Sequence, residues 1–183
     1  PAALTVFIDY CYDNYKSDYY DIVLWDHGGG PALGFGYDDR FEGDINLDMA
    51  ELIKSFDDSK LINDGQKFEI IDFAACLMSS VEIVTALYDF ADNLVLSSDI
   101  ENGTGQYYTL VLEVLRKNPS MSGFELGKNI VDWFITFDNY KYGDSTTSTL
   151  SVINTDNYKK VTYSGTTYVI LESGHDYSID EHN

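Results

Sequence analysis

The chain has 183 residues, of which 31 are acidic and 11 are basic, and its formal net charge at pH 7 is −20. A chain this acidic, with its few cations scattered, repels the phosphate backbone of nucleic acids, so we expect no nucleic-acid partner. Hydrophobic residues make up 44% of the sequence, which is enough for a folded core and excludes a mainly disordered chain. No apolar run approaches the roughly 20 residues of a membrane-spanning helix, so no membrane span is expected.

Helices and buried strands are predicted to alternate along the chain. Such alternation is typical of an α/β fold with a mostly parallel sheet that helices cover on both faces. In chain order, the patterns predict a helix over 4–15 that buries Cys11, a fully buried strand over 21–25, a Gly- and Asp-rich loop over 28–45, a helix over 47–56, a buried strand over 68–73, a helix that Ser79 caps, a strand over 94–98, a helix over 110–115, a helix that Ser122 caps, a strand over 149–153 and a further strand over 168–171.

Two reactive side chains follow the first two predicted strands. The first strand ends in WDHGGG, which places His27 at its exit, and the second ends in DFAACLM, which places Cys76 at its exit. The carboxyl ends of neighbouring parallel strands open onto the same crevice, so we expect the imidazole and the thiol to face each other. This pair predicts a nucleophile with a base within reach.

Thiol acyl transfer makes further demands that the neighbouring residues can meet. A nearby imidazole and the N-terminus of the helix capped at Ser79 would both favour the thiolate. The tetrahedral oxyanion needs two backbone N–H donors, which Gly28 and Cys76 can supply. Because Gly28 has no Cβ, a substrate carbonyl could approach closely there.

The motif WDHGGG, followed at 49 residues from the histidine by AACLMSS and a glutamate, resembles the clostripain family of cysteine peptidases, which are bacterial relatives of caspases, legumains and gingipains. The resemblance covers roughly residues 1–157 as one peptidase domain and leaves 158–183 as a tail or an extra strand. It implies a caspase-like three-layer α/β/α sandwich and cleavage of peptide or protein substrates after a basic residue. It also implies that Cys76 is the nucleophile, that His27 is the general base and acid, and that Gly28 and Cys76 form the oxyanion hole.

The resemblance carries expectations about the whole protein as well. The family's first strand and helix have no counterpart in this sequence, so it is interpreted as a processed or partial chain with a companion fragment of the same precursor as a partner. Secretion or display at a bacterial cell surface is implied too. Family members can be cut during maturation, and Arg40 is a candidate for such a cut.

One position departs from the family pattern. Members usually have aspartate two residues before the nucleophile, in the pocket for the side chain that precedes the cleaved bond, but this chain has Ala74. A desolvated ion pair at that place would be worth about 2–4 kcal/mol, so the specificity for a basic residue stays open. Asp99 or Glu101 could restore the negative charge, whereas Asp72 lies about 6–7 Å deeper along the strand and is a weaker substitute.

Other polar residues have simpler interpretations. An acidic loop contains five carboxylates that could bind Ca²⁺, at positions Asp38, Asp39, Glu42, Asp44 and Asp48, but it lacks the EF-hand pattern and is interpreted as solvated. Calcium dependence occurs in the family, so calcium stays an alternative, no metal ligand is assigned and no cofactor is required. Cys11 is interpreted as core filler, and His175 and His182 as solvated residues of the tail.

Two other functions are alternatives to a cysteine endopeptidase. Ala74 favours a protease-like fold that has lost turnover and binds peptides or partner proteins. A glycan- or metal-binding module, suggested by the 15 tyrosines and the acidic surface, has no motif in its support.

Overall fold

A computed structural model describes residues 1–38, 40, 46–103, 105–143, 148–156, 158–163 and 166–171, the last two segments from Lys159 onward by their backbone. The described helices are α1 (Ala2–Asn14), α2 (Gly30–Leu33), α3 (Met49–Asp57), α4 (Lys60–Asn63), α5 (Val81–Leu87), α6 (Tyr108–Lys117) and α7 (Gly123–Tyr142). The described strands are β1 (Asp21–Trp25), β2 (Phe68–Ala74), β3 (Ala91–Leu96), β4 (Ser151–Asn154), β5 (Tyr158–Tyr163) and β6 (Thr166–Leu171).

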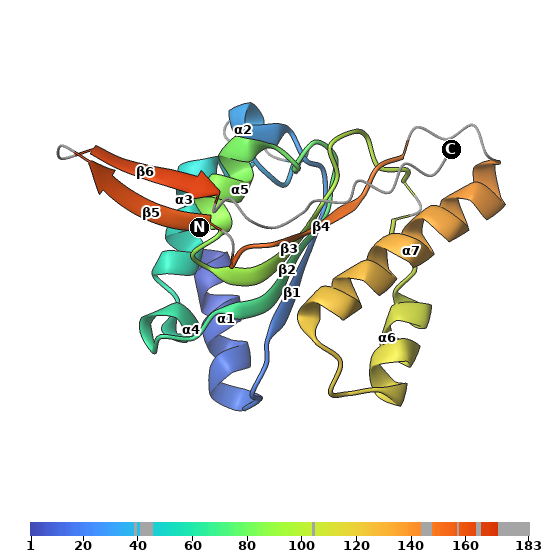
Figure 1. Ribbon diagram of the computed structural model, residues 1–183, viewed down its shortest axis with the longest axis horizontal. Helices are drawn as coiled ribbons and strands as arrows, with labels where there is room; N and C mark the ends of the chain where they lie inside the picture. The colour runs from blue at the N-terminus through green and yellow to red at the C-terminus, as the bar shows by residue number, and fades with distance from the viewer. Residues whose placement is uncertain are drawn as a thin grey trace.

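The central sheet has four strands in the order β1-β2-β3-β4. The first three are parallel, and β4 runs antiparallel to β3. This sheet confirms the predicted α/β class with mostly parallel strands. The segment 168–171, predicted as a further strand, is extended but belongs to a separate antiparallel hairpin of β5 and β6, which projects away from the sheet in Figure 1.

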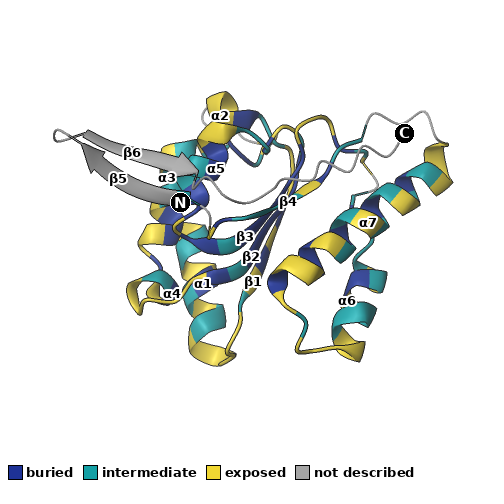
Figure 2. Cartoon of the chain, in the orientation of Figure 1, coloured by how far each residue is buried: buried dark blue, intermediate teal, exposed yellow. Residues whose placement is uncertain are grey.

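Helices cover both faces of the sheet, so the molecule has three layers (Figure 1). The layer of α1, α3, α4 and α5 buries the larger apolar cluster, in which Phe56, Phe73 and Leu94 are almost fully inaccessible. The layer of α6 and α7 buries a smaller cluster that includes Ile70, Val95 and Phe134. Figure 2 shows the central strands as the most buried part of the chain. Neighbouring residues of β2 thus pack into opposite apolar clusters, so its side chains point to the two faces of the sheet in turn.

Strand β1 differs from the prediction because it is the edge of the sheet. Its side chains alternate between exposed and buried, and Val23 and Trp25 are 45% and 70% exposed. The sequence predicted a fully buried strand, since a continuous apolar run is usually covered on both faces. That prediction is wrong here because α7 packs over β2, β3 and β4, with α6 packed against α7, and one face of β1 stays open.

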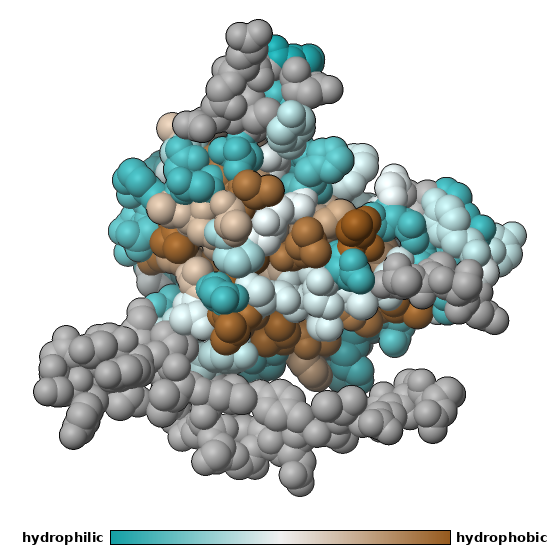
Figure 3. Space-filling view, turned by 90° about the horizontal axis from the view of Figure 1, so that it is seen from above, coloured by the Kyte–Doolittle hydropathy of each residue, from teal (hydrophilic) through white to brown (hydrophobic). Residues whose placement is uncertain are grey.

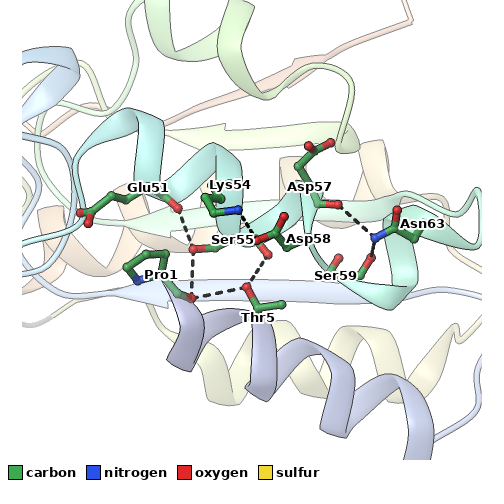
Figure 4. Close-up of polar contacts among 9 residues, drawn as sticks. All are labelled: Pro1, Thr5, Glu51, Lys54, Ser55, Asp57, Asp58, Ser59 and Asn63. Atoms are coloured by element: carbon green, nitrogen blue, oxygen red, sulfur yellow. Dashed lines mark hydrogen bonds and ion pairs between the residues drawn. The ribbon is translucent and has the colours of Figure 1, made fainter.

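Helix α1 packs on α3 and α4 through fewer apolar residues than expected. Ile8 is buried, whereas Phe7 and Tyr15 are exposed and Cys11 is only half-buried. Polar contacts supplement this packing (Figure 4): the Ser55 hydroxyl donates to the Pro1 carbonyl at 3.2 Å, and the Thr5 hydroxyl donates to the Ser55 carbonyl at 3.0 Å. These bonds join α1 to α3, the helix that follows the loop after β1.

The helix caps match the sequence with one shift. Ser122 caps α7 as predicted, since its hydroxyl accepts a hydrogen bond from the N–H of Glu125. Helix α5 begins one residue later than expected because Ser80, not Ser79, accepts from the N–H of Ile83. None of the described helices combines the length and the apolar character that crossing a membrane would require.

Candidate active site

His27 and Cys76 lie at matched positions past the ends of two paired strands. In the parallel register of β1 and β2, Trp25 is the partner of Ala74, and each of the two side chains lies two residues further along its own strand. Both line one cavity of about 430 Å³. The structure thus brings together the thiol and the imidazole that the sequence singled out. The residues lining the cavity are Trp25, Asp26, His27, Ala74, Ala75, Cys76, Glu101, Asn102, Gly103 and Gly105.

The surroundings of the Cys76 sulfur differ from the sequence-based expectation. The helix that follows it in the chain is short and starts only at Val81. Instead, the backbone N–H of Glu101 donates to the Cys76 sulfur at 3.2 Å. A donor aimed at sulfur stabilises the thiolate by a charge-assisted hydrogen bond. No sequence pattern marks this contact, because it joins two loops 25 residues apart.

The turn after Cys76 is held in a strained conformation. Leu77 has a φ of +62°, which a residue with a branched side chain adopts at a cost of roughly 1–2 kcal/mol. Its N–H donates to the Asp99 carbonyl at 3.1 Å, and the N–H of Ser79 donates to the Ser97 carbonyl at 2.7 Å. The loop after β3 therefore holds the turn that presents the thiol.

The loop that carries His27 is fixed by its backbone. The His27 carbonyl accepts from the N–H of Gly36 at 2.9 Å. The Asp26 carboxylate accepts from the N–H groups of His27 and Tyr37 at 2.6 and 3.1 Å. The Tyr37 ring lies edge-on to the imidazole, with 6.3 Å between ring centroids. These contacts hold the histidine at the mouth of the cavity.

Two backbone donors beside the thiol have no acceptor. Within the described part of the chain, neither the Gly28 N–H nor the Cys76 N–H donates a hydrogen bond. The structure adds a reason for the glycine that the sequence does not show: a Cβ on Gly28 would lie 2.0 Å from the Cys76 carbonyl oxygen. Its missing side chain makes room for the Cys76 backbone, and this close contact holds the two loops together.

Buried acidic groups lie beneath the cavity. Glu101 is 9% exposed, and burial, together with the charge of Asp72, raises its pKa to about 8, although the N–H of Ala75 bonds to its carboxylate. Burial also raises the pKa of Asp72 to about 7, although a hydrogen bond from Gln106 at 2.8 Å acts to lower that pKa. Burial and these two acids raise the pKa of Tyr108. The sequence did not reveal Gln106 or Tyr108 as neighbours of the site.

The structure separates the two residues proposed to replace the missing pocket aspartate. Glu101 lines the cavity together with Ala74. Asp99 is exposed, its carboxylate accepts from the N–H of Ile100 at 2.7 Å, and it is not among the cavity residues. The structure therefore favours Glu101 over Asp99 as the candidate for the substrate pocket, because the Asp99 side chain turns back onto its own loop.

The acidic loop offers little for a metal within the described residues. Among them, no group of three or more His, Cys, Asp or Glu side chains is placed to hold a metal ion. Asp38 pairs with Arg40 at 3.0 Å, and Asp48 caps α3. Asp39, Glu42 and Asp44 lie outside the described residues, as do His175 and His182.

Comparison with known proteins identifies the family. A family model described as the clostripain family matches residues 1–170. The chain belongs to the clostripain family. Clostripain of Hathewaya histolytica is 30% identical over 135 residues, which are 63% of this chain and 24% of clostripain.

Solved structures agree on the fold. A secreted C11 cysteine protease of Bacteroides thetaiotaomicron, in complex with an irreversible peptide inhibitor, has a TM-score of 0.66 and 23% identity over 85% of this chain and 45% of its own. An inactive zymogen of a C11 protease from Parabacteroides distasonis has a TM-score of 0.62 and 23% identity over 85% of this chain and 40% of its own. The predicted caspase-like fold is thus confirmed, and the chain spans less than half the length of these relatives.

Proposed function

We propose that the chain carries the catalytic groups of a cysteine endopeptidase, as the clostripain family implies. The observation that carries the proposal is the placement of His27 and Cys76 at equivalent positions of paired strands, lining one cavity. Two free backbone N–H groups next to the thiol support it. A nucleophile, a proton carrier and oxyanion donors are the set that thiol acyl transfer needs.

The reaction follows from these positions. The Cys76 thiol gives its proton to His27, the sulfur attacks the scissile carbonyl carbon, and the N–H groups of Gly28 and Cys76 bind the oxyanion that forms. His27 gives a proton to the leaving amine as the C–N bond breaks, which leaves a thioester on Cys76. His27 then takes a proton from water, which attacks the thioester and releases the acid. The Glu101 N–H stabilises the sulfur each time it is a thiolate.

We further propose that Glu101 supplies the negative charge that Ala74 lacks. Glu101 lines the cavity and its side chain is buried beside it, and a lysine or arginine side chain entering there would pair with its carboxyl. Because burial raises the pKa of Glu101 to about 8, the empty pocket is largely neutral at pH 7, and a cation would draw the proton off. A basic residue before the cleaved bond is therefore the preferred substrate.

Processing and location complete the proposal. Arg40 is exposed, with 82% of its side chain accessible, and follows the loop of His27, so a cut after it would leave two associated fragments of one precursor. An Arg40→Ala chain that still appears as two fragments would contradict this cut. We propose a secreted or surface-exposed bacterial enzyme, as the secreted relative suggests.

The test combines turnover with labelling of the thiol. Fluorogenic peptides ending in arginine or lysine should be cleaved, and an acyloxymethyl ketone probe should label Cys76 far faster than a free thiol. Cys76→Ala should abolish both, and His27→Ala should reduce turnover at least about a hundredfold. Cys11→Ala is the matched control and should behave as the parent. No step uses a metal, so turnover in calcium and in a chelator shows whether the acidic loop contributes.

Ala74 favours one second candidate, a module that binds peptides without cutting them. In that case Cys76 would react with the probe no faster than Cys11, while peptides ending in a basic residue would still bind. The same labelling experiment, read beside a binding titration with the Cys76→Ala chain, separates the two functions.

A further inference from the structure

A second cavity lies on the other side of His27 from the thiol cavity. Its volume is about 400 Å³, and His27 is the residue that both cavities share. The loop between β1 and α3 builds it, with α2 inside that loop. The lining residues are His27, Gly28, Gly29, Leu33, Gly34, Gly36, Tyr37 and Asn46. In the view from above in Figure 3, hydrophobic and hydrophilic side chains intermingle on the face of the molecule that is seen.

The lining of this cavity is largely apolar, and several of its polar groups are hydrogen-bonded within the loop. The N–H groups of Gly29 and Gly36 donate to the carbonyls of Gly34 and His27, each at 2.9 Å. The amide of Asn46 donates to the Leu33 carbonyl. Among the described residues that line the cavity, His27 and Tyr37 are the ones with a titratable side chain. Among these described residues only His27 could pair with a charged ligand, whereas an apolar ligand would contact Leu33 and Tyr37.

The loop holds the cavity open through close backbone contacts. Gly34 has a φ of +74°, and a Cβ on it would lie 2.0 Å from the Leu47 carbonyl oxygen. Phe35 bridges to both Gly28 and Leu47. The wall is thus tied to the residue that supplies an oxyanion donor and to the segment before α3, so the cavity is present before a substrate binds.

The side on which the leaving amine departs indicates which part of the substrate would occupy the second cavity. In the proposed function, on which this inference rests, His27 protonates the leaving amine, so the leaving part of the substrate lies next to His27. The side chain before the bond enters the cavity with Ala74 and Glu101, and the chain after the bond continues past the imidazole. We propose that the second cavity binds the side chain immediately after the cleaved bond and selects an apolar one, such as leucine or phenylalanine. The net charge of −20 further disfavours an acidic residue there.

Capture of the acyl-enzyme by added amines tests this without changing the residue before the bond. A fluorogenic arginyl amide acylates Cys76, and amino acid amides then compete with water at about pH 8, where much of the amine is free. The amine nitrogen attacks the thioester carbonyl, the C–S bond breaks, the C–N bond forms, and His27 takes the proton that the amine loses. The amides of leucine and phenylalanine should be captured at least about tenfold better than those of glycine and aspartate.

A negative charge introduced at the cavity gives a more specific test. Leu33 is 66% exposed, and Leu33→Glu should lower capture of leucine amide and raise capture of lysine amide severalfold. The control Leu112→Glu changes a similarly exposed leucine on α6, which is 62% exposed. It should capture the acceptor amides with the same preferences as the parent. If Leu33→Glu does not fold, the comparison of amino acid amides as acceptors on the parent protein still tests the inference.

The outcomes separate this inference from the proposed function. If the arginyl amide is turned over but all acceptors are captured equally, or aspartate amide is preferred, the inference is overturned and the peptidase stands. If the arginyl amide is not turned over, the proposed function fails, and this inference fails with it.

Discussion

His27 and Cys76 each lie two residues beyond the paired positions Trp25 and Ala74, so the register of β1 and β2 places both residues just past the same end of the sheet. The contact of Gly28 with the Cys76 carbonyl then joins the two loops directly past the strands. The register and this contact hold together four groups: the thiol, the imidazole and two N–H donors. Chemistry at this site therefore depends on backbone geometry as much as on the two reactive side chains.

Gly28→Ala should damage the site more than the fold. The new Cβ would collide with the Cys76 carbonyl oxygen, so the loops must separate and the oxyanion donors move apart. Losing one such donor costs about a hundredfold or more in kcat, and we expect a loss of that size in peptide turnover. The measurement is steady-state kinetics beside chemical denaturation.

The control for that variant is Gly65→Ala. Gly65 has a φ of +82° with open space around its Cβ position, so alanine costs roughly 1–2 kcal/mol of stability through backbone strain alone. It should retain turnover. Equal losses of activity in the two variants would mean that Gly28 acts through stability and not through the oxyanion donors.

The central strands and the reactive pair could be predicted because their signals are local. An apolar run followed by His27, and another followed by Cys76, place both residues at strand ends. The open face of β1 could not be predicted in this way, because it depends on where α6 and α7 pack. Val23 and Trp25 have the residue types of a buried strand and are nevertheless exposed.

Contacts between loops were the other limit of prediction. Asp99 and Glu101 are two residues apart with the same charge, and only the turn of their loop decides that Glu101 lines the cavity. The hydrogen bond to the Cys76 sulfur comes from the backbone N–H of Glu101, so it does not depend on which side chain position 101 carries. Such contacts are set by tertiary structure, so the residue pattern does not predict them.

Ala74→Asp should increase the preference for a basic residue before the cleaved bond. The new carboxylate would line the same cavity as Glu101 and would pair with an arginine side chain away from water. The ratio of kcat/KM for an arginine substrate to that for a glutamine substrate should rise at least about tenfold. Ala74→Asn has a similar size without the charge and should leave the ratio unchanged, whereas a rise in both variants would mean that volume, not charge, sets the preference.

Asp138→Ala should loosen the wall of the thiol cavity. The Asn102 amide donates to the buried Asp138 carboxylate and, at 3.0 Å, to the Ser148 hydroxyl. Removing the buried acceptor should cost about 1–3 kcal/mol in the free energy of unfolding and raise KM severalfold, because Asn102 lines the cavity. Asp132→Ala, at an exposed position of the same helix, should change neither quantity. An unchanged KM in Asp138→Ala would show that the bond serves stability alone.

The raised pKa values predict how stability changes with pH. Folding raises the pKa of Glu101 from its ordinary value of 4.5 to about 8, so the folded chain binds the proton more tightly than the unfolded chain. The stability that this group contributes is complete below about pH 4.5 and is lost as the pH rises through 8. Asp72, with its pKa raised to about 7, acts in the same direction, and the two acids titrate as a pair.

Glu101→Gln should therefore become more stable relative to the parent as the pH rises. Between pH 5 and pH 9 we expect the difference in unfolding free energy to move in favour of the variant by roughly 2 kcal/mol, measured by denaturant titration at several pH values. Asp99→Asn, at an exposed position of the same loop, should give a curve parallel to that of the parent. A Glu101→Gln curve parallel to the parent would mean that this carboxyl is ionised in the folded chain at pH 7, and that a basic side chain meets a charge already present in the pocket.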